Sequence, residues 1–428
     1  MISPTSRIFF LCFMFTMSVS SLTASENDSI SQVRSEHVDS LATIHQDTCR
    51  RDAGHFAFQL SSNVSHMIHH GPENKEILHS YGTSFYDIRL KYRYSDKRYA
   101  PYDRAMNYPS LQVGLQYGDF SHVHIYRPTT PYESRIGYLL TLFGGMQFDF
   151  LRKGRWSIGT DLQNGVAYCP HPFNEHDNVD NEIIGSTLSI YVGFGFYARY
   201  RFLPHWSMSV GVDFKHISNG TLDRPNIGVN ALGATLSLSY DIDDYVPSKS
   251  KGTKPLLKAE DSVRGFYVEG IVGLGMKALF DDFSLNHSKH NPIYGFFTTM
   301  IAPMYRYHLL HASGIGIDYT YADYVYKIHE YDQRQSRPEI YYSPHVFGIS
   351  LRHEIFYRHI SLNAGVGVYL FRHLGHLMEN ESRLYQTVGL RYSLPFTRDR
   401  IFVGYNVKAH RFQKVDCVQL VAGFRLGR

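Results

Sequence analysis

Several stretches of the chain alternate between apolar residues and residues that are polar or glycine. The ranges 187–200, 266–276 and 360–370 show this alternation over most of their length, with apolar side chains at every second position. Successive side chains of a β-strand point to opposite faces, so each stretch would form a strand with one apolar and one polar face. The pattern therefore predicts β-structure along these ranges.

The predicted strands are long. They run for about 10 to 15 residues, whereas strands in globular proteins average about five or six. Aromatic residues lie near their ends, and the alternation recurs in about sixteen segments, as in the lipid-facing band of an outer-membrane barrel. We therefore expect an all-β fold, an antiparallel transmembrane β-barrel of about 16 strands in the outer membrane. A soluble β-protein is the alternative.

The connections between the predicted strands alternate in length. Long connections such as PHPFNEHDNVDNE and SNGTLDRPNIGVN follow odd-numbered strands, and most connections after even-numbered strands are short, such as RKGR and LPH. Outer-membrane barrels have short periplasmic turns and long external loops, so the odd strands should run outward. Two even-numbered connections are exceptions, namely SDKRYAPYDRAMNY and the lysine-rich segment 241–261.

The second exception divides the chain into two similar halves. Residues 200–215 read YRFLPHWSMSVGVDFK and residues 392–408 read YSLPFTRDRIFVGYNVK, with a Leu-Pro, a Val-Gly and a final Lys in common. We interpret this as a duplicated eight-strand unit, which could form two barrels or one barrel of sixteen strands. The expected order is a signal peptide (1–24), a flexible leader (25–53), a first barrel unit (54–243), a linker (244–263) and a second unit (264–428).

Composition excludes several classes of partner and site. The net charge is only +4, so no nucleic-acid partner is expected. The four cysteines have neither a disulfide framework nor metal-ligand spacing, and we expect no cofactor and no metal. An acidic loop with Asp177, Asp180 and Glu182 could hold a divalent ion, but it lacks a defined ligand spacing and is better interpreted as a solvated loop.

One strand carries candidate catalytic residues at its outward end. In the range 206–218, the even positions form the apolar row, and His216 and Ser218 continue that row. A nucleophilic serine needs a base within about 3 Å, and side chains at positions i and i+2 of a strand share a face. The pair is therefore either an active site beside the outer leaflet or a strand end that has reached water.

The next strand adds a third polar residue at the same edge. Its even positions are apolar from Leu232 to Leu238, and Asn230 begins that row. A residue at this place could orient the ring of His216, as the third member of a catalytic triad does.

The segment HISN, followed by PNIG, resembles the lipid A 3-O-deacylase (PagL-like) and acyloxyacyl hydrolase family of outer-membrane barrels. The segment NEIIGSTLSIYVGFGF, residues 181–196, is similar to the strand before the site in Bacteroidetes-type members. The resemblance is close over about residues 181–242 and looser in the second half. It implies an eight-stranded barrel with a Ser-His-Glu triad on its outer surface.

Carried over by position, the resemblance implies that Ser218 is the nucleophile and His216 the base, with Asn219 helping to bind the oxyanion. The family's glutamate falls on Asn230, which can orient the histidine but carries no charge; Asp223, in the same loop, is the alternative. No serine follows His410 in the second half, so that half is expected to be structural or to bind lipopolysaccharide.

The expected function is hydrolysis of an ester-linked acyl chain of lipid A, with lipopolysaccharide in the outer leaflet as the partner. The alternative is a non-enzymatic barrel, a pore or scaffold, that retains a degenerate motif. The acyl position that is cleaved and the formation of a homodimer stay open.

Overall fold

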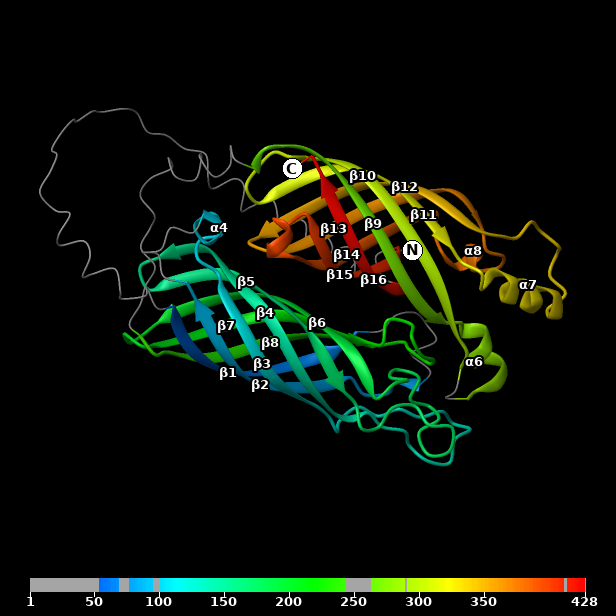
Figure 1. Cartoon of the computed structure of the whole chain (residues 1–428). Coiled ribbons are helices and arrows are strands. Elements are labelled where there is room, and N and C mark those ends of the chain that lie inside the picture. The colour runs from blue at the N-terminus through cyan, green and yellow to red at the C-terminus, as the bar shows by residue number, and fades with distance from the viewer. Residues whose placement is uncertain are drawn as a thin grey trace, which may run out of the picture.

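The computed structural model describes residues 54–68, 77–94, 101–243, 263–288, 291–411 and 414–427, and these residues form two antiparallel β-barrels (Figure 1). The strands of the first barrel are β1 (His55–Met67), β2 (Gly82–Arg93), β3 (Ser110–Phe120), β4 (Gly137–Lys153), β5 (Trp156–Tyr168), β6 (Leu188–Arg201), β7 (Trp206–Ser218) and β8 (Val229–Asp241). Those of the second are β9 (Gly265–Ala278), β10 (Ile293–Arg306), β11 (His311–Tyr321), β12 (Ser343–Tyr357), β13 (Ile360–His373), β14 (Leu384–Ser393), β15 (Ile401–His410) and β16 (Lys414–Leu426).

Short helices lie in the connections between strands. They are α4 (Pro101–Ala105) in the first half and α6 (Phe280–Asn286), α7 (Val325–Arg334), α8 (Leu377–Asn380) and the 3₁₀ turn η1 (Pro395–Thr397) in the second. No helix in the described ranges is long and apolar enough to cross a membrane.

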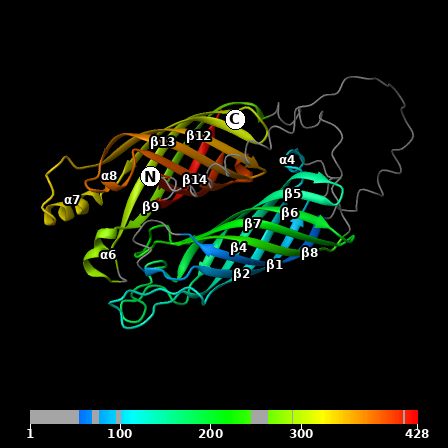
Figure 2. The same cartoon turned by 180° about the vertical axis from the view of Figure 1, so that it is seen from behind.

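Each half of the chain closes on itself. Strand β1 pairs with β8, with Phe58 opposite Tyr240, and β9 pairs with β16, with Leu274 opposite Leu420. The alternative of one sixteen-stranded barrel is thereby resolved in favour of two closed eight-stranded barrels. They lie side by side in both views (Figures 1 and 2).

The outer faces of both barrels are apolar. Side chains on this face are largely exposed in the isolated chain, at 60% for Leu115 and 71% for Leu420, which is the arrangement expected of a surface that lipid covers. The faces follow the predicted alternation: in β7, Val210 is exposed whereas Ser207 and Ser209 are buried in the lumen. The protein therefore has the architecture of an outer-membrane barrel.

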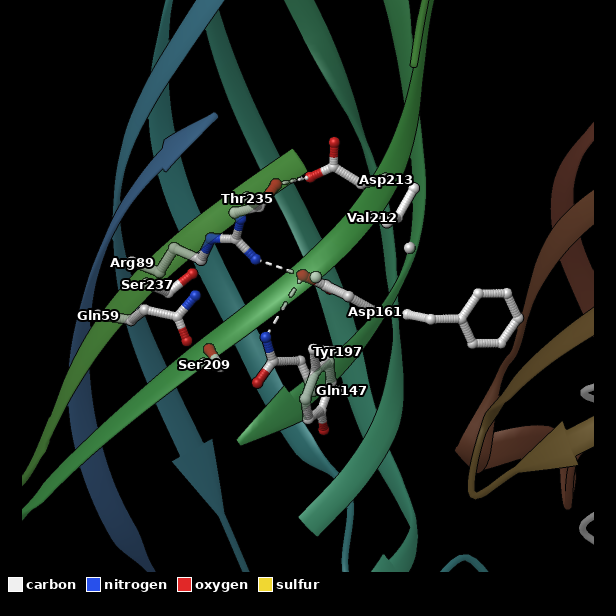
Figure 3. A pocket seen from close by; sticks show the side chains of 13 residues that line it. Gln59, Arg89, Gln147, Asp161, Tyr197, Ser209, Val212, Asp213, Thr235 and Ser237 are labelled. Carbon is white, nitrogen blue, oxygen red and sulfur yellow. Dashed lines mark hydrogen bonds and ion pairs between the residues drawn. The ribbon is translucent and has the colours of Figure 1, made fainter. Parts of the chain in front are cut away.

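Polar side chains in the lumen of the first barrel form a hydrogen-bonded network. Arg89 donates to both Asp87 and Asp161, and Asp161 also accepts a hydrogen bond from Gln147 at 3.3 Å (Figure 3). The cavity beside this network measures only about 30 Å³. An eight-stranded barrel is just wide enough for side chains to fill it, and buried charges require partners.

The second lumen has its own set of buried ion pairs. Arg391 donates to Glu269 at 2.9 Å, and Arg425 donates to Glu354 at 2.7 Å. All four side chains are at most 2% exposed. Buried ion pairs therefore cross both lumens. Beside the short turns, the first lumen widens into a cavity of about 350 Å³ that is lined by residues including Lys91, Asp149 and Arg199.

Connection lengths confirm the predicted alternation over the described ranges. The β5–β6 connection (169–187) and the β11–β12 connection (322–342) are long, whereas β4–β5 (154–155) and β12–β13 (358–359) are tight turns. The long β2–β3 connection, an exception to the alternation, holds α4. The signal peptide, the leader and residues 244–262 of the linker lie outside the described residues.

The alternation makes a prediction about orientation. An epitope tag inserted at Asp177, an exposed residue of the β5–β6 connection, should bind antibody on intact cells, because long loops face outward. A tag in the turn at Gly154 should bind antibody only after permeabilisation. Immunofluorescence of both strains is the measurement, and the reverse pattern would overturn the assigned orientation.

Closure of each half makes a second prediction. Residues 54–243 produced alone should fold in detergent micelles, because all strand edges of the first barrel are paired within that range. Heat-modifiable migration on a gel and resistance to protease are the measurements. A fragment that stays unfolded while the full chain folds would show that the first barrel needs the second to form.

Candidate active site

Pairing of β6, β7 and β8 brings three polar residues together at one end of the first barrel. His216 lies directly opposite Asn230 across the β7–β8 pair, and Ser218 lies opposite Ile190 of β6. Because His216 and Ser218 are two positions apart, their side chains point to the same, outward face. The register therefore assembles the three side chains that the sequence pattern places on the outward row.

The side chains form a continuous hydrogen-bonded relay. Oδ1 of Asn230 lies 2.8 Å from Nδ1 of His216, and Nε2 of His216 lies 2.8 Å from Oγ of Ser218. An amide oxygen can only accept, so Nδ1 carries the hydrogen in this bond. In the neutral ring, the lone pair of Nε2 then faces the serine hydroxyl, which is the arrangement a general base requires.

The relay is more covered than the sequence suggests. Ser218 is only 7% exposed and Asn230 only 4%, although the outward row of β7 is exposed further along the strand. Residues 219–228, named here the active-site loop, join β7 to β8, and Gly228 of this loop lies against His216 and Ser218. The alternation predicts that His216 and Ser218 lie on the outward face. The low exposure of Ser218 is seen only in the folded chain.

Gly228 marks how closely the loop approaches the relay. Its φ is +82°, which favours glycine, and an added Cβ would lie 3.2 Å from Cβ of Ser218 and 3.3 Å from Cε1 of His216. A larger residue would therefore press on His216 and Ser218.

A second loop supports the active-site loop within the first barrel. The N–H of Gly228 donates to the carbonyl of Ile183 at 2.8 Å, and that of Ile227 donates to the carbonyl of Glu182 at 3.1 Å. These acceptors belong to the segment NEIIG, which stands out in the sequence only for its family resemblance. Its role in holding the loop has no signal in the strand pattern.

Asn219 organises the active-site loop. Its N–H donates to Oδ1 of Asn226 at 3.1 Å, its Oδ1 accepts from the N–H of Thr221 at 3.1 Å, and its Nδ2 donates to the carbonyl of Asp223 at 3.2 Å. The side chain is 3% exposed and lies directly after Ser218. Three bonds from one residue hold the loop in a defined shape beside the serine.

The hydrogen bonds of Asp223 do not support it as the triad acid. Oδ1 of this residue accepts from the N–H of Arg224 at 2.8 Å, and Nδ1 of His216 is bonded to Asn230. The geometry brings the amide of Asn230, rather than this carboxylate, to the histidine.

In the acidic loop that could have held a divalent ion, an arginine pairs with two of the carboxylates. Arg127 donates to Glu182 at 2.6 Å and to Asp180 at 3.3 Å, while Asp177 is exposed. An internal cation therefore neutralises two of the three carboxylates, so the loop is a structural ion-pair cluster.

The described residues of the second barrel contain no equivalent relay. Lys408 of β15 is buried in its lumen as Lys215 is in the first, and the next outward residue is Ala409 in place of a histidine. His410 points inward, is fully buried, and lies near Glu381 and Asp416. Each of these carboxylates already has a cationic partner, namely Arg372 for Glu381 and Lys277 for Asp416.

Each barrel matches one known protein family. Residues 103–239 match the family described as lipid A 3-O-deacylase (PagL), and residues 266–428 match the family described as acyloxyacyl hydrolase, C-terminal domain. A search of curated proteins finds no match. The family resemblance stated for the first half is thereby supported, whereas the Bacteroidetes-type assignment and the homodimer gain no support and stay predictions.

Solved structures show only a distant similarity. The outer membrane enzyme PagL is 14% identical, with a TM-score of 0.27 and coverage of 42% of this chain and 97% of that chain. The β-domain of the Bordetella autotransporter BrkA is 10% identical, with a TM-score of 0.23 and coverage of 88% and 100%. The two closed barrels and the two family matches, rather than these distant similarities, identify the chain as an outer-membrane β-barrel protein whose barrels match the lipid A deacylase and acyloxyacyl hydrolase families.

Proposed function

We propose that the protein is a serine esterase of the outer membrane that hydrolyses an ester-linked acyl chain of lipid A. The observation that carries the proposal is the relay from Asn230 through His216 to Ser218, with 2.8 Å at each step, on the outward face of the first barrel. An ester of a lipid in the outer leaflet would approach from this side. The family match of residues 103–239 supports the substrate class.

The reaction begins with attack by Ser218. As Oγ bonds to the ester carbonyl carbon, Nε2 of His216 takes the hydroxyl proton, which leaves a tetrahedral intermediate with a negative oxygen. The imidazolium then gives the proton to the departing alcohol oxygen of lipid A. The deacylated lipid A leaves with a free hydroxyl group, and the acyl chain stays on Ser218 as an ester.

Water completes the cycle by the same route. His216 removes a proton from a water molecule as it attacks the acyl-enzyme, and the proton is then given to Oγ of Ser218. The products are a free fatty acid and lipid A with one fewer acyl chain. General acid–base help of this kind typically accelerates a reaction by about 10² to 10⁴-fold.

Asn230 orients His216 without contributing charge. Its amide oxygen holds the Nδ1–H tautomer, so Nε2 is ready to accept the proton. A carboxylate would also stabilise the imidazolium that forms during attack. We therefore expect a slower reaction than the same scaffold would support with an acid at this position.

Asn219 is the proposed side-chain donor to the oxyanion. Its Nδ2 carries two N–H bonds, and the bond to the carbonyl of Asp223 uses one of them. The second is proposed to contact the oxyanion together with backbone amides next to Ser218. A preorganised donor of this type contributes about 10² to 10³-fold to the rate in serine hydrolases.

A non-enzymatic scaffold is the second candidate, and the amide at position 230 favours it, since an inactive relic could lose its acid. A pore is a weaker candidate, because buried ion pairs cross both lumens, Arg89 with Asp161 in the first and Arg391 with Glu269 in the second. The two classes are separated by mass spectrometry of lipid A from cells with and without the protein. Loss of one acyl chain only in cells that contain it supports the esterase; identical lipid A in both strains supports the scaffold.

A further inference from the structure

The active-site loop is held by the second barrel as well as by the first. Oγ1 of Thr221 donates to the carbonyl of Asp416 at 3.0 Å, and the carbonyl of Thr221 accepts from the N–H of Ala278 at 2.7 Å. Arg224 adds a bond from Nε to the carbonyl of Ala278 at 3.1 Å. These partners lie at the end of β9 and the start of β16, next to the first barrel (Figures 1 and 2).

Packing at Gly220 confirms how tightly the two barrels meet here. Gly220 has a φ of +66°, and an added Cβ would lie 2.3 Å from Cγ2 of Val418 in the second barrel. The same Cβ would lie 3.6 Å from Cδ1 of Ile190 in β6. The residue two positions after Ser218 is therefore enclosed between the barrels.

The second barrel reaches the reacting groups through Thr221. The N–H of Thr221 donates to Oδ1 of Asn219 at 3.1 Å, so the residue that Asp416 and Ala278 hold also fixes the proposed oxyanion donor. Asn219 is in turn covalently next to Ser218. A displacement of Thr221 would move this donor relative to the nucleophile.

Arg224 secures the far side of the loop. Its carbonyl accepts from Nδ2 of Asn291 at 3.2 Å, in addition to the bond from its guanidinium to Ala278. Burial lowers the pKa of Arg224 to about 10, while Asp416 and Asp281 act in the opposite direction. The side chain therefore stays charged at neutral pH and continues to donate.

We propose that the second barrel positions the active-site loop, with Thr221 and Arg224 as positioning residues, and so completes the oxyanion site of the first barrel. The inference rests on the proposed esterase function. It gives the second barrel, which has no relay of its own in the described residues, a role in the reaction at Ser218.

The chain offers a matched control at the opposite end of the barrels. Asp103 of α4 accepts from the hydroxyl of Tyr357 at 2.6 Å and pairs with Arg358. This contact also joins the two barrels, but it lies beside the short turns, far along the strands from Ser218. Asp103→Asn weakens the interface without touching the loop.

The test compares full-length Thr221→Val, Thr221→Ser and Asp103→Asn in detergent micelles with purified lipid A. Thr221→Val keeps the side-chain shape and removes the donor, so kcat for fatty-acid release should fall about tenfold, in line with the cost of small misplacements, with KM little changed. Thr221→Ser restores the donor and should recover most of the rate. Asp103→Asn should stay within about twofold of the parent protein.

The outcomes separate the inference from the function on which it rests. If Thr221→Val keeps the parent kcat, or Asp103→Asn loses as much as Thr221→Val, the second barrel only stabilises the molecule and the inference is wrong. Thermal unfolding of each variant shows whether the fold is intact, and Arg224→Gln serves as a second variant if Thr221→Val fails to fold. Release that is unchanged in Ser218→Ala would instead overturn the proposed function itself.

Discussion

Ser218→Ala should abolish the release of fatty acid from lipid A and leave both barrels folded. The hydroxyl is the proposed nucleophile, so its loss should reduce the rate by about a thousandfold or more. The residue lies on the outward face of β7, outside the packed lumens, so the barrel should keep its stability. Mass spectrometry of the released acids measures the rate, and heat-modifiable migration on a gel reports folding.

The neighbouring residues supply the comparison variants. His216→Ala should be nearly as severe, because a serine without a base is a poor nucleophile at neutral pH. Ser209→Ala, on the lumen side of the same strand, should keep the parent rate. If Ser218→Ala releases as much fatty acid as the parent protein, the esterase proposal is wrong and the scaffold alternative takes its place.

Asn230→Asp should raise the rate of the same reaction. The substitution changes the amide to a carboxylate of equal size, 2.8 Å from Nδ1 of His216, so the same tautomer is held and the imidazolium gains a counter-charge. An increase of about tenfold or more is expected, because the reverse change costs far more than that in serine proteases. Steady-state kinetics with purified lipid A measures it.

Two further variants identify the residue that supports the histidine. Asn230→Glu restores the residue type that the resemblance implies, although its longer side chain must fit a position that is 4% exposed. Asp223→Asn should leave the rate within about twofold, because that carboxylate is bonded to the N–H of Arg224. A large loss in Asp223→Asn together with no response at Asn230 would assign the supporting role to Asp223.

The sequence alone determined the strands and their faces. Alternation with a period of two is a local property, and it persists because one face of each strand meets lipid and the other meets a filled lumen. For this reason the row from Trp206 to Ser218 could be predicted from the residue pattern, including the outward direction of His216. The place of Asn230 on the adjoining strand follows from the same reasoning, since the two strands form a hairpin.

Tertiary structure alone decided how many barrels form. Closure depends on β1 pairing with β8 and β9 with β16, strands that lie far apart in the sequence and carry the same alternation as every other strand. The residues along a strand edge do not specify which other strand will pair with it. One barrel of sixteen strands and two barrels of eight strands are therefore expected to have nearly the same alternation of apolar and polar residues. The choice follows from the summed pairing of whole strands.

The surroundings of the serine were also decided by tertiary contacts. Residues such as Thr221 and Gly220 lie in a loop without periodicity, and their partners Asp416 and Val418 lie almost two hundred positions away. Sequence reasoning therefore placed Ser218 on a face open to lipid, whereas in the folded chain it is only 7% exposed, with Gly228 of the active-site loop against it. Hydrogen bonds between loops and distant strands depend on the docked positions of both, and no local pattern records those positions.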